Sequence, residues 1–393
     1  MRILIIHCAY QYKGGEDTVV AEEAQLLQQA GHDVQLLKFS NEGKAVMKIL
    51  QLPFNVPSYL KATKAIKKFT PDVIHLHNLH FAASPSVLYA IKNREIPFVC
   101  TLHNYRLLCP SATLFYKGQA FLNSLTQTFP WTAVRLGIYK NSRLLTFWMA
   151  LSMQIHYWLG TWNLPNRFIV LSAHAKKIFL ASKLDLQDEQ IVIKPNFCSP
   201  PQLSDIKRSE EFLFVGRLTE EKGVKMLLQL FSSIPHRITL AGDGPLKEEV
   251  ISYSGKYPNI NYVGSLQKQE LSHLMQRSTA LVFPSIWYEG MPLTIIEAFS
   301  CGLPVIATRL GAMEHMVTPG YDGLLFDAGN KTELSQILDQ WVSMPAESKA
   351  KFSINAQSTY KQSYTPEKNV EQLLAIYQSV IAKQEQPSLA LAG

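Results

Sequence analysis

Cysteines are few in this sequence, and none of them are clustered. Five are spread over 393 residues without a C-x-x-C spacing, at Cys8, Cys100, Cys109, Cys198 and Cys301. This scattering excludes a disulfide framework and is typical of a reduced, cytoplasmic protein. The sequence also lacks a Walker loop, H-E-x-x-H, G-x-S-x-G and Asp-x-Asp. Their absence excludes the P-loop, zincin and serine-hydrolase sites that such motifs build.

Long apolar runs are scarce as well. The start, Met1–His7, has too short an apolar core for a signal peptide and predicts a first β-strand instead. The composition is 47% hydrophobic and 18% charged, which excludes a disordered chain. A length of 393 residues is enough for two domains, each with its own core.

Acidic residues are under-represented in the first half. Residues 1–200 hold 21 Lys and Arg against 11 Asp and Glu, whereas residues 201–393 hold 17 against 20. Four lysines of the first half, Lys61, Lys64, Lys67 and Lys68, share one predicted helix. Such a basic half favours anionic partners, although a solvated helix face explains the lysines equally well. No zinc-finger spacing or aromatic-interleaved basic motif is present, so nucleic acid is not expected as a partner.

The segment Leu144–Asn166 has no formal charge and nearly the length of a membrane span. Polar residues interrupt it, and its large apolar residues recur at spacings of three and four, which predicts one apolar stripe on a helix: Leu144, Trp148, Leu151, Ile155, Trp158 and Trp162. Three alternatives stay open here. The segment is a helix packed in the fold, an interfacial membrane helix or apolar acceptor wall, or a true span.

Strand patterns alternate with helix patterns in both halves of the sequence. Strands are expected at residues 3–7, 34–37, 73–76, 98–102 and 168–171, and then at 212–215, 238–241, 260–263, 280–283 and 305–307. This βαβ rhythm predicts an α/β protein with one parallel sheet in each half. The polar, proline-rich stretch 194–202 is the expected join. Ligands of parallel sheets bind beyond the carboxyl ends of the strands, so we expect the site in the cleft between the two domains.

Two glutamates follow the strand at 280–283 in different surroundings. Glu289 lies in a Gly/Pro loop, and Glu297 lies about two turns into the following apolar segment. A strand, loop and helix in this order place backbone N–H groups and a positive dipole end at the loop. The two carboxylates could therefore hold a phosphate-bearing, hydroxyl-rich ligand such as a nucleotide sugar.

Two cations follow another strand of the second half. Arg217 and Lys222 leave the loop Gly216–Gly223. Cations at a strand's carboxyl end can hold a diphosphate and neutralise charge as it departs. The alternative is a pair of ordinary surface cations, which the Glu-Lys-Gly context disfavours.

Weaker signals lie elsewhere. Gly14 and Gly15 separate the first strand from a helix, where backbone could approach an anion. His103 ends a strand and could contact a polar substrate or act as an acid or base. The turn Ala241–Pro245 is interpreted as loop geometry. A metal site at His75, His77 and His80 is disfavoured, because the sequence places no carboxylate or thiolate near them.

Taken together, these motifs resemble the retaining family-4 glycosyltransferases of the GT-B fold (glycosyl transferases group 1). The resemblance runs nearly end to end, through Gly14-Gly15, the strand at 72–77, Thr-Leu-His-Asn at 101–104, the Arg217/Lys222 loop and the Glu289…Glu297 pair. It implies two Rossmann-like domains with parallel sheets. Residues 1–198 would form the acceptor domain, residues 199–365 the donor domain, and a last helix at about 366–382 would pack back on the first domain.

The resemblance also implies roles. Arg217 and Lys222 would bind the donor diphosphate, Glu289 the donor sugar, and Glu297 the ribose. Backbone groups would contact sugar and phosphate along Gly290, Met291, Pro292, Leu293 and Thr294. His103 would line the sugar site and Gly15 would approach the phosphates. Many relatives carry Asp after this histidine, whereas this sequence has Asn104, which weakens any acid role there.

The function implied is transfer of a sugar from a nucleoside diphosphate sugar, a UDP- or GDP-sugar, to an acceptor hydroxyl with retention and without a metal or other cofactor. The acceptor would be a carbohydrate or lipid-linked glycan of exopolysaccharide, capsule or glycolipid assembly. We expect a cytoplasmic protein in peripheral contact with anionic membrane at its inner face. Alternatives are a nucleotide-sugar epimerase, a phosphorylase of similar build, and a non-catalytic nucleotide-sugar-binding scaffold.

Overall fold

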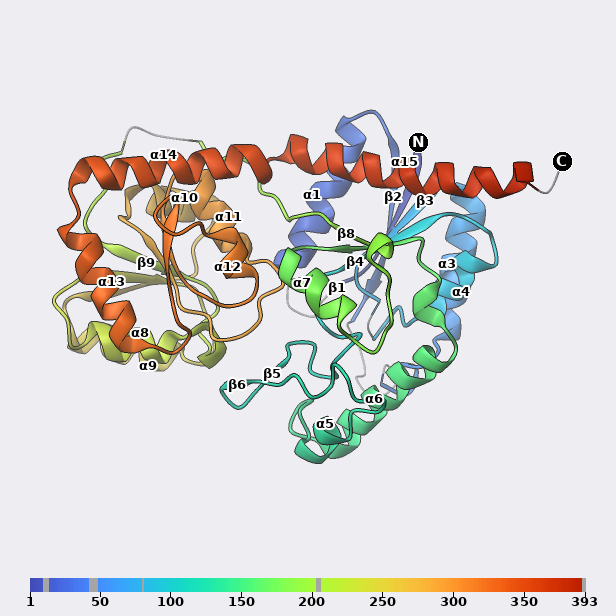
Figure 1. Ribbon diagram of the computed structural model, residues 1–393, viewed down its shortest axis with the longest axis horizontal. Helices are drawn as coiled ribbons and strands as arrows, with labels where there is room; N and C mark the ends of the chain where they lie inside the picture. The colour runs from blue at the N-terminus through green and yellow to red at the C-terminus, as the bar shows by residue number, and fades with distance from the viewer. Residues whose placement is uncertain (10–13, 42–48, 80, 203–205, 391–393) are drawn as a thin grey trace. The chain divides into compact units, whose positions relative to one another are not determined.

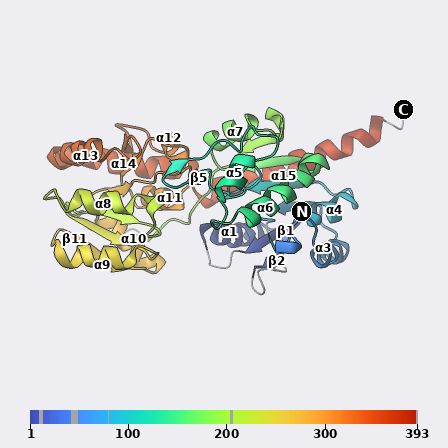
Figure 2. The same cartoon turned by 90° about the horizontal axis from the view of Figure 1, so that it is seen from below.

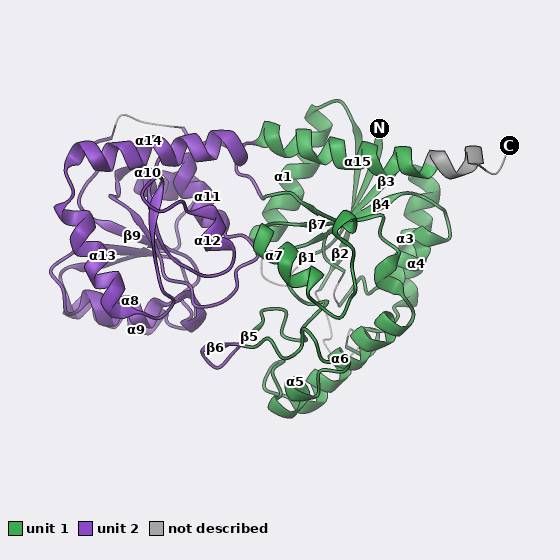
Figure 3. Ribbon diagram, viewed as in Figure 1, with its two compact units in different colours: residues 1–114, 121–195, 366–393 green, residues 115–120, 196–365 purple. Residues whose placement is uncertain are grey.

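The chain forms two compact units, each described here by itself (Figure 3). A computed structural model describes residues 1–9, 14–41, 49–79, 81–202 and 206–390. Unit 1 comprises residues 1–114, 121–195 and 366–393, and unit 2 comprises residues 115–120 and 196–365. The boundary thus falls three residues before the expected one at 198. Lys194 is buried within unit 1, whereas Asn196 bonds to Met291 of unit 2.

Unit 1 is built on a six-stranded parallel sheet in the order β2-β1-β3-β4-β7-β8 (Figure 1). Its strands are β1 (Arg2–Ala9), β2 (Asp33–Ser40), β3 (Val73–Leu76), β4 (Phe98–Leu102), β7 (Arg167–Val170) and β8 (Ile191–Ile193). Its helices are α1 (Gly15–Gln29), α3 (Val56–Phe69), α4 (Ser86–Lys92), α5 (Trp131–Leu136), α6 (Arg143–Trp158), α7 (Ala173–Leu180) and α15 (Pro366–Ala390). The β5 (Phe115–Tyr116) and β6 (Gln119–Ala120) hairpin groups with unit 2.

Both faces of the unit 1 sheet are buried. Ile3 and Ile5 of β1 join a core with α1 and α15, to which α15 contributes Leu373, Ile376, Tyr377 and Val380. Leu4 and Ile6 alternate with them and are equally buried, so they face the opposite side of the sheet. This two-sided burial explains why β1 reads as a continuous apolar run rather than an alternating one.

Unit 2 repeats the architecture with the order β11-β10-β9-β12-β13-β14, again all parallel. Its strands are β9 (Phe212–Val215), β10 (Ile238–Ala241), β11 (Ile260–Gly264), β12 (Leu281–Phe283), β13 (Val305–Thr308) and β14 (Gly323–Phe326). Its helices are α8 (Val224–Phe231), α9 (Lys247–Lys256), α10 (Lys268–Arg277), α11 (Leu293–Ser300), α12 (Ala312–Met316), α13 (Lys331–Ser343) and α14 (Ala346–Ser363). Figure 2 shows helices on both sides of these strands.

The strand order of each sheet has one switch point, where a ligand-binding crevice is expected. In unit 2 the order 3-2-1-4-5-6 reverses direction between β9 and β12, and in unit 1 it reverses between β1 and β3. The loops that leave two such strands run to opposite faces of the sheet, which opens a crevice at their carboxyl ends. The expected motifs follow these strands: Arg217 and Lys222 follow β9, Glu289 follows β12, Gly14 and Gly15 follow β1.

The helix predicted from the uncharged segment is present as α6, and its apolar stripe is exposed at the two ends and half-buried between them. Leu144 is 76% exposed and Trp158 is 68% exposed. The buried positions include several polar residues instead, among them Thr146, Ser152, Gln154 and His156. The helix ends at Trp158, so Trp162, the last member of the predicted stripe, lies beyond it and is buried. None of the helices among the described residues has both the length and the apolar character to cross a membrane.

Candidate functional site

The centre of the candidate site in unit 2 is an ion pair between the loops after β9 and β12. The Lys222 Nζ lies 2.5 Å from the Glu289 Oε1, and both side chains are largely buried. The Ser285 hydroxyl donates to the same carboxylate oxygen over 2.8 Å. A charged hydrogen bond of this length, shielded from water, fixes the direction of both side chains. The structure therefore brings Lys222 and Glu289 together at the switch point of the sheet.

Aromatic rings hold the lysine on its other sides. The Lys222 Nζ lies 5.4 Å from the ring centroids of both Phe283 and Trp287. A cation near two aromatic faces gains attraction without losing its charge. An ammonium group has three N–H donors, and Glu289 uses one of them. The remaining donors leave Lys222 able to bind a second anionic group.

Close backbone packing explains the Glu-Lys-Gly sequence. Gly223 has φ +75°, and a Cβ there would lie 2.2 Å from the carbonyl oxygen of Pro284. No other residue fits this contact without moving one of the two loops. The Ile286 N–H donates to the Glu221 carbonyl over 2.9 Å and joins the same loops. The glycine and this hydrogen bond set the distance from Lys222 to Glu289.

Arg217 lies outside this buried pair. Its side chain is 66% exposed, and its guanidinium is 4.0 Å from Glu221. At this distance and exposure the ion pair contributes little to stability. Arg217 can therefore turn toward a ligand at small cost, and its role in diphosphate binding stays a prediction.

Glu297 also lies apart from the ion pair. It lines a pocket of about 370 Å³ that includes Lys268, Ser300 and Cys301 but neither Lys222 nor Glu289. The two glutamates therefore occupy separate positions, and their expected roles, Glu289 at the sugar and Glu297 at the ribose, stay predictions. One position is the buried pair at the switch point, and the other is an open pocket beside α11.

Part of the loop that leads into α11 makes contacts within unit 2 and is not available to a ligand. The Met291 carbonyl accepts from the Asn196 amide over 3.4 Å, and its Sδ accepts from the Asn196 N–H over 3.2 Å. Pro292 caps α11 and has no N–H to donate. Donors to a ligand from this loop are therefore limited to residues such as Gly290, Leu293 and Thr294, all of which are partly exposed.

The turn Ala241–Pro245 has the structural role that the sequence suggested. A Cβ on Gly242 would lie 1.9 Å from the Gly216 carbonyl, and one on Gly244 would lie 2.6 Å from the Leu218 carbonyl. Both glycines also have φ above +140°. This turn supports the loop after β9 from behind.

In unit 1, the loop after β1 is organised by a carboxylate. Asp17 accepts from the Gly14 N–H over 2.9 Å and lies 2.8 Å from the His7 Nε2. Gly15 is the first residue of α1, and Glu16 and Asp17 occupy the first turn. These two carboxylates offset the positive helix end and use one of its free N–H groups. Contact of Gly15 with phosphate remains a prediction.

His103 belongs to a chain of buried histidines. Its Nε2 lies 3.0 Å from the Nδ1 of His77, and the rings of His75 and His77 are 4.0 Å apart between centroids. Burial lowers the pKa of His75 to about 4 and that of His103 to about 3, and it holds the pKa of His77 well below 6.5. All three rings are therefore neutral at pH 7.

A carboxylate does lie near these histidines, contrary to the expectation from sequence. Ligand atoms of Glu23, His75 and His77 come within 4.8 Å of one another. However, the Lys194 Nζ binds Glu23 over 2.7 Å, and both nitrogens of His75 are 2.7 Å from the hydroxyls of Tyr377 and Thr101. Lys194 thus already neutralises Glu23, and both nitrogens of His75 have partners. Within this cluster the Oε2 of Glu23 and the Nε2 of His77 are left without a hydrogen bond, and two such atoms are too few to hold a metal. His80 lies outside the described residues.

Sequence reasoning missed Glu23, Lys194 and Tyr377. Glu23 had a visible signal, because it stands on the apolar face of the helix expected after Gly15, where an unpaired carboxylate is costly. Lys194 and Tyr377 had none. They lie 171 and 354 residues from Glu23 along the chain, and only the folded structure brings them to it.

Family models match both halves of the chain. Residues 13–199 match the model described as Glycosyltransferase Family 4, and residues 200–359 match Glycosyl transferases group 1. The chain is 30% identical to the sulfoquinovosyl transferase SQD2 of Arabidopsis thaliana over 297 residues, which is 71% of this chain and 51% of that protein. It is 22% identical to a phosphatidyl-myo-inositol mannosyltransferase of Mycobacterium leprae over 86% of both chains.

The chain therefore spans about half the length of the Arabidopsis relative and about a third of some others. Among solved structures it resembles Alr3699/HepE of Anabaena in complex with UDP. That match has a TM-score of 0.67 at 18% identity and covers 96% of this chain and 100% of that one. The likeness confirms the predicted fold, with two Rossmann-like units of GT-B type.

Proposed function

We propose that this chain, which belongs to the family 4 and group 1 glycosyltransferases of the GT-B fold, moves a sugar from a nucleoside diphosphate sugar to an acceptor hydroxyl and retains the anomeric configuration. The observation that carries the proposal is the buried ion pair of Lys222 and Glu289 at the switch point of the unit 2 sheet. A site that keeps a fixed cation beside a fixed carboxylate suits a ligand with both phosphates and hydroxyls.

Each charged residue has a proposed role. Lys222 and Arg217 would bind the diphosphate and stabilise the charge that builds as the phosphate departs. Glu289 would accept hydrogen bonds from the sugar hydroxyls, and its contact with Lys222 would align sugar and phosphate. Glu297, in its own pocket, would bind the ribose. His103 and Gly15 are proposed as further donor contacts.

The proposed mechanism is same-face attack. Glu289 is already held by Lys222 and Ser285, which disfavours it as the nucleophile of a two-step displacement. A departing phosphate oxygen can instead take the proton of the acceptor hydroxyl. Charge neutralisation by Lys222 and Arg217 makes this possible without a metal, which is part of the proposal.

A donor screen with two matched variants tests this function. We expect a UDP- or GDP-sugar to raise the Tm of the full-length chain, since ligand at 100 times its Kd stabilises by about 2.7 kcal/mol. With the donor found, Glu289→Gln should lower kcat more than nucleotide affinity. Glu297→Gln should weaken nucleotide binding more than kcat.

The two glutamines keep size and shape, so each variant is the control of the other. Equal loss of nucleotide binding in both, with no separate effect on kcat, would contradict this division of roles. Turnover of the donor without an acceptor would instead indicate an epimerase, and release of sugar phosphate a phosphorylase. Binding without any turnover would indicate a scaffold.

For the acceptor, we propose a lipid-linked glycan reached from the inner face of an anionic membrane. The support is the apolar stripe of α6, whose end residues Leu144 and Trp158 are exposed. Helix α6 lies at the lower edge of unit 1 in Figure 1. Exposed basic residues precede it, namely Arg135, Lys140 and Arg143. Apolar side chains beside basic ones suit a membrane interface with anionic lipid. The Mycobacterium leprae relative is by name a phosphatidyl-myo-inositol mannosyltransferase, which also favours a lipid acceptor.

Vesicle sedimentation tests the membrane contact. We expect the full-length chain to sediment with vesicles that contain anionic lipid, and Leu144→Ser/Trp158→Ser to reduce that binding by about tenfold, because each apolar side chain contributes burial energy. Ile354→Ser is the matched control, since Ile354 is 69% exposed in unit 2. The contact is ruled out if the wild type stays in the supernatant, or if the control lowers binding as much as the double variant.

A further inference from the structure

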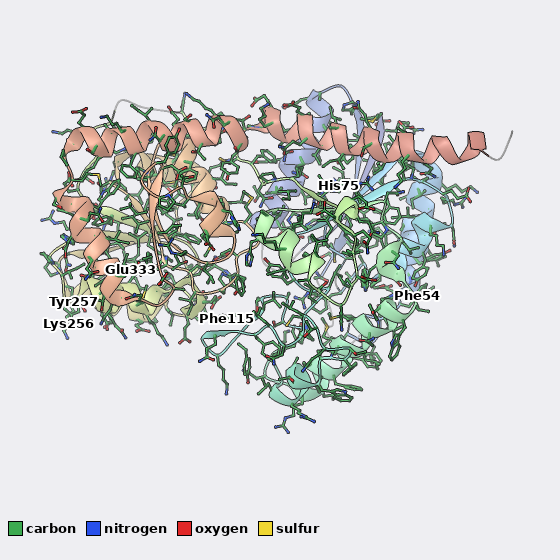
Figure 4. The ribbon with its side chains drawn as sticks, in the orientation of Figure 1. Phe54, His75, Phe115, Lys256, Tyr257 and Glu333 are labelled. Carbon is green, nitrogen blue, oxygen red and sulfur yellow. The ribbon has the colours of Figure 1, made fainter. Side chains whose placement is uncertain are left out.

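A buried polar cluster lies under the carboxyl ends of the unit 1 strands. Its members come from α1, β3, the loops after β3, β4 and β8, and α15: Glu23, His75, His77, His103, Lys194, Asn369 and Tyr377. Figure 4 labels His75 within this region. Of these seven residues His103 alone is partly exposed, and it lines a small cavity together with His77, Asn104 and Trp162. The cluster therefore connects the core to one point at the surface.

The contacts within the cluster run from Glu23 through His77 to His103. Glu23 uses its Oε1 for Lys194 and Asn369, at 2.7 Å and 3.2 Å. Its Oε2 lies 3.5 Å from the Nε2 of His77, and neither atom forms a hydrogen bond in the described part of the chain, so electrostatic attraction is what couples them. The Nδ1 of His77 in turn lies 3.0 Å from the Nε2 of His103. Three residues thus form one line from a buried carboxylate to the cavity.

The protons on this line follow from elementary electrostatics. A neutral imidazole carries one N–H and one lone pair. Since a carboxylate attracts the N–H and repels the lone pair, the proton of His77 belongs on Nε2. Its Nδ1 is then an acceptor, so the Nε2 of His103 must donate. The Nδ1 of His103 is left with its lone pair, and it has no hydrogen bond to any residue that the structure describes.

We propose that Glu23 and His77 are positioning residues that hold His103 as its Nε2–H tautomer, so that its Nδ1 accepts a hydrogen bond from a hydroxyl of the donor sugar. This inference rests on the proposed function and narrows it. A lone pair at this point selects a ligand group that can donate, such as a hydroxyl. It disfavours a phosphate oxygen, which can only accept.

The change Glu23→Gln should exchange the donor and acceptor nitrogens of His77 and His103 while keeping the buried contacts. A glutamine can point its oxygen at Lys194 and its amide N–H at the Nε2 of His77. That nitrogen then becomes the acceptor, His77 carries its proton on Nδ1, and His103 is forced to carry its own on Nδ1. His103 can then no longer accept from a hydroxyl. The variant thus differs from the wild type in which ring nitrogens of His77 and His103 carry the proton, and not in side-chain size.

Nitrogen-15 spectra of histidine-labelled full-length protein test the proposal, with His103→Gln to assign the His103 signals. We expect an unprotonated Nδ1 on His103 in the wild type and a protonated one in Glu23→Gln. With donor and acceptor, kcat should fall about tenfold in Glu23→Gln, the effect of one lost hydrogen bond, while nucleotide affinity stays the same. Tyr377→Phe is the matched control, because it removes a buried hydroxyl from His75 without touching the line.

A protonated Nδ1 on His103 in the wild type would overturn the proposal, and that spectrum needs no variant to fold. An unchanged tautomer and kcat in Glu23→Gln would overturn it as well, as would equal effects of Tyr377→Phe on the His103 tautomer. The spectra need no substrate. If no transfer activity is found, the proposed function fails while the tautomer remains measurable, so the two failures can be told apart.

Discussion

Lys222→Ala is expected to lower the turnover of sugar transfer by about 100-fold or more. The change removes the cation that forms a buried ion pair with Glu289. Charge on the leaving diphosphate develops in the transition state, so a preorganised cation contributes more there than in the bound substrate. Steady-state kinetics should therefore show the loss in kcat more than in KM. Arg217→Ala should act in the same direction, through a side chain that starts out exposed.

Two further variants separate charge from packing. Lys222→Met keeps an unbranched side chain over Phe283 and Trp287 but has no charge, and it should lose as much activity as the alanine variant. Lys225→Ala is the control. Lys225 lies close by in the sequence, but its side chain is 44% exposed and its contact with Glu220, at 3.9 Å, is a loose surface ion pair. The Tm of each variant shows whether Glu289 without its counter-ion destabilises unit 2. Near-normal turnover of both Lys222→Ala and Arg217→Ala would refute the assignment.

Acid should destabilise unit 1 from about pH 6.5 downward, well before carboxylates are protonated. Burial holds the pKa of His75 at about 4 and that of His77 well below 6.5 in the folded state. In the unfolded chain both return to about 6.5. Below that pH the unfolded state binds protons that the folded state does not, so the free energy of unfolding falls as pH falls.

The expected loss in the free energy of unfolding of unit 1 is large for so few side chains. His75 alone should cost about 3 kcal/mol of stability between pH 7.5 and 4.5, and His77 acts with the same sign. Burial would raise the pKa of the Glu23 carboxyl, but its ion pair with Lys194 keeps that pKa below the usual value, so Glu23 adds a loss of stability only at still lower pH. Hydrogen exchange of peptides from β3 and β4, measured at several pH values, reports the stability of unit 1 separately. His75→Gln should flatten the slope by about 1.4 kcal/mol per pH unit. A stability of unit 1 that is flat from pH 7.5 to 5 would contradict the prediction.

Much of the fold was predictable because the apolar runs are short and clearly bounded. Strands β3, β4, β9 and β10 have the bounds expected from sequence, since each is buried on both faces and ends at polar or glycine residues. The strands β8 and β14 and the helices α13 and α14 were not foreseen. Strand order was not predictable either, because nothing in a local pattern records which strand pairs with which.

The candidate site was predictable in its residues but not in its geometry. The motifs identified Lys222 and Glu289, yet their contact depends on Gly223 packing against Pro284, which only the folded backbone shows. The pocket that Glu297 lines was likewise not predictable, because its other residues come from segments far apart in the sequence. On α6 the spacing of apolar residues identified a stripe correctly but could not say which way it faced. Periodicity fixes a face of a helix, and only the neighbours decide whether that face is buried.

The place of α15 in the core of unit 1 has a consequence for how the chain is made. Leu373 and Tyr377 are fully buried against side chains such as Ile3 and Val99, which are synthesised first. Helix α1 can cover part of this face early, but the part under α15 stays exposed until residues beyond 365 have been translated. The segments of unit 2, by contrast, are all complete at residue 365. The usual order of folding during synthesis, in which the first domain is finished first, is reversed for this architecture.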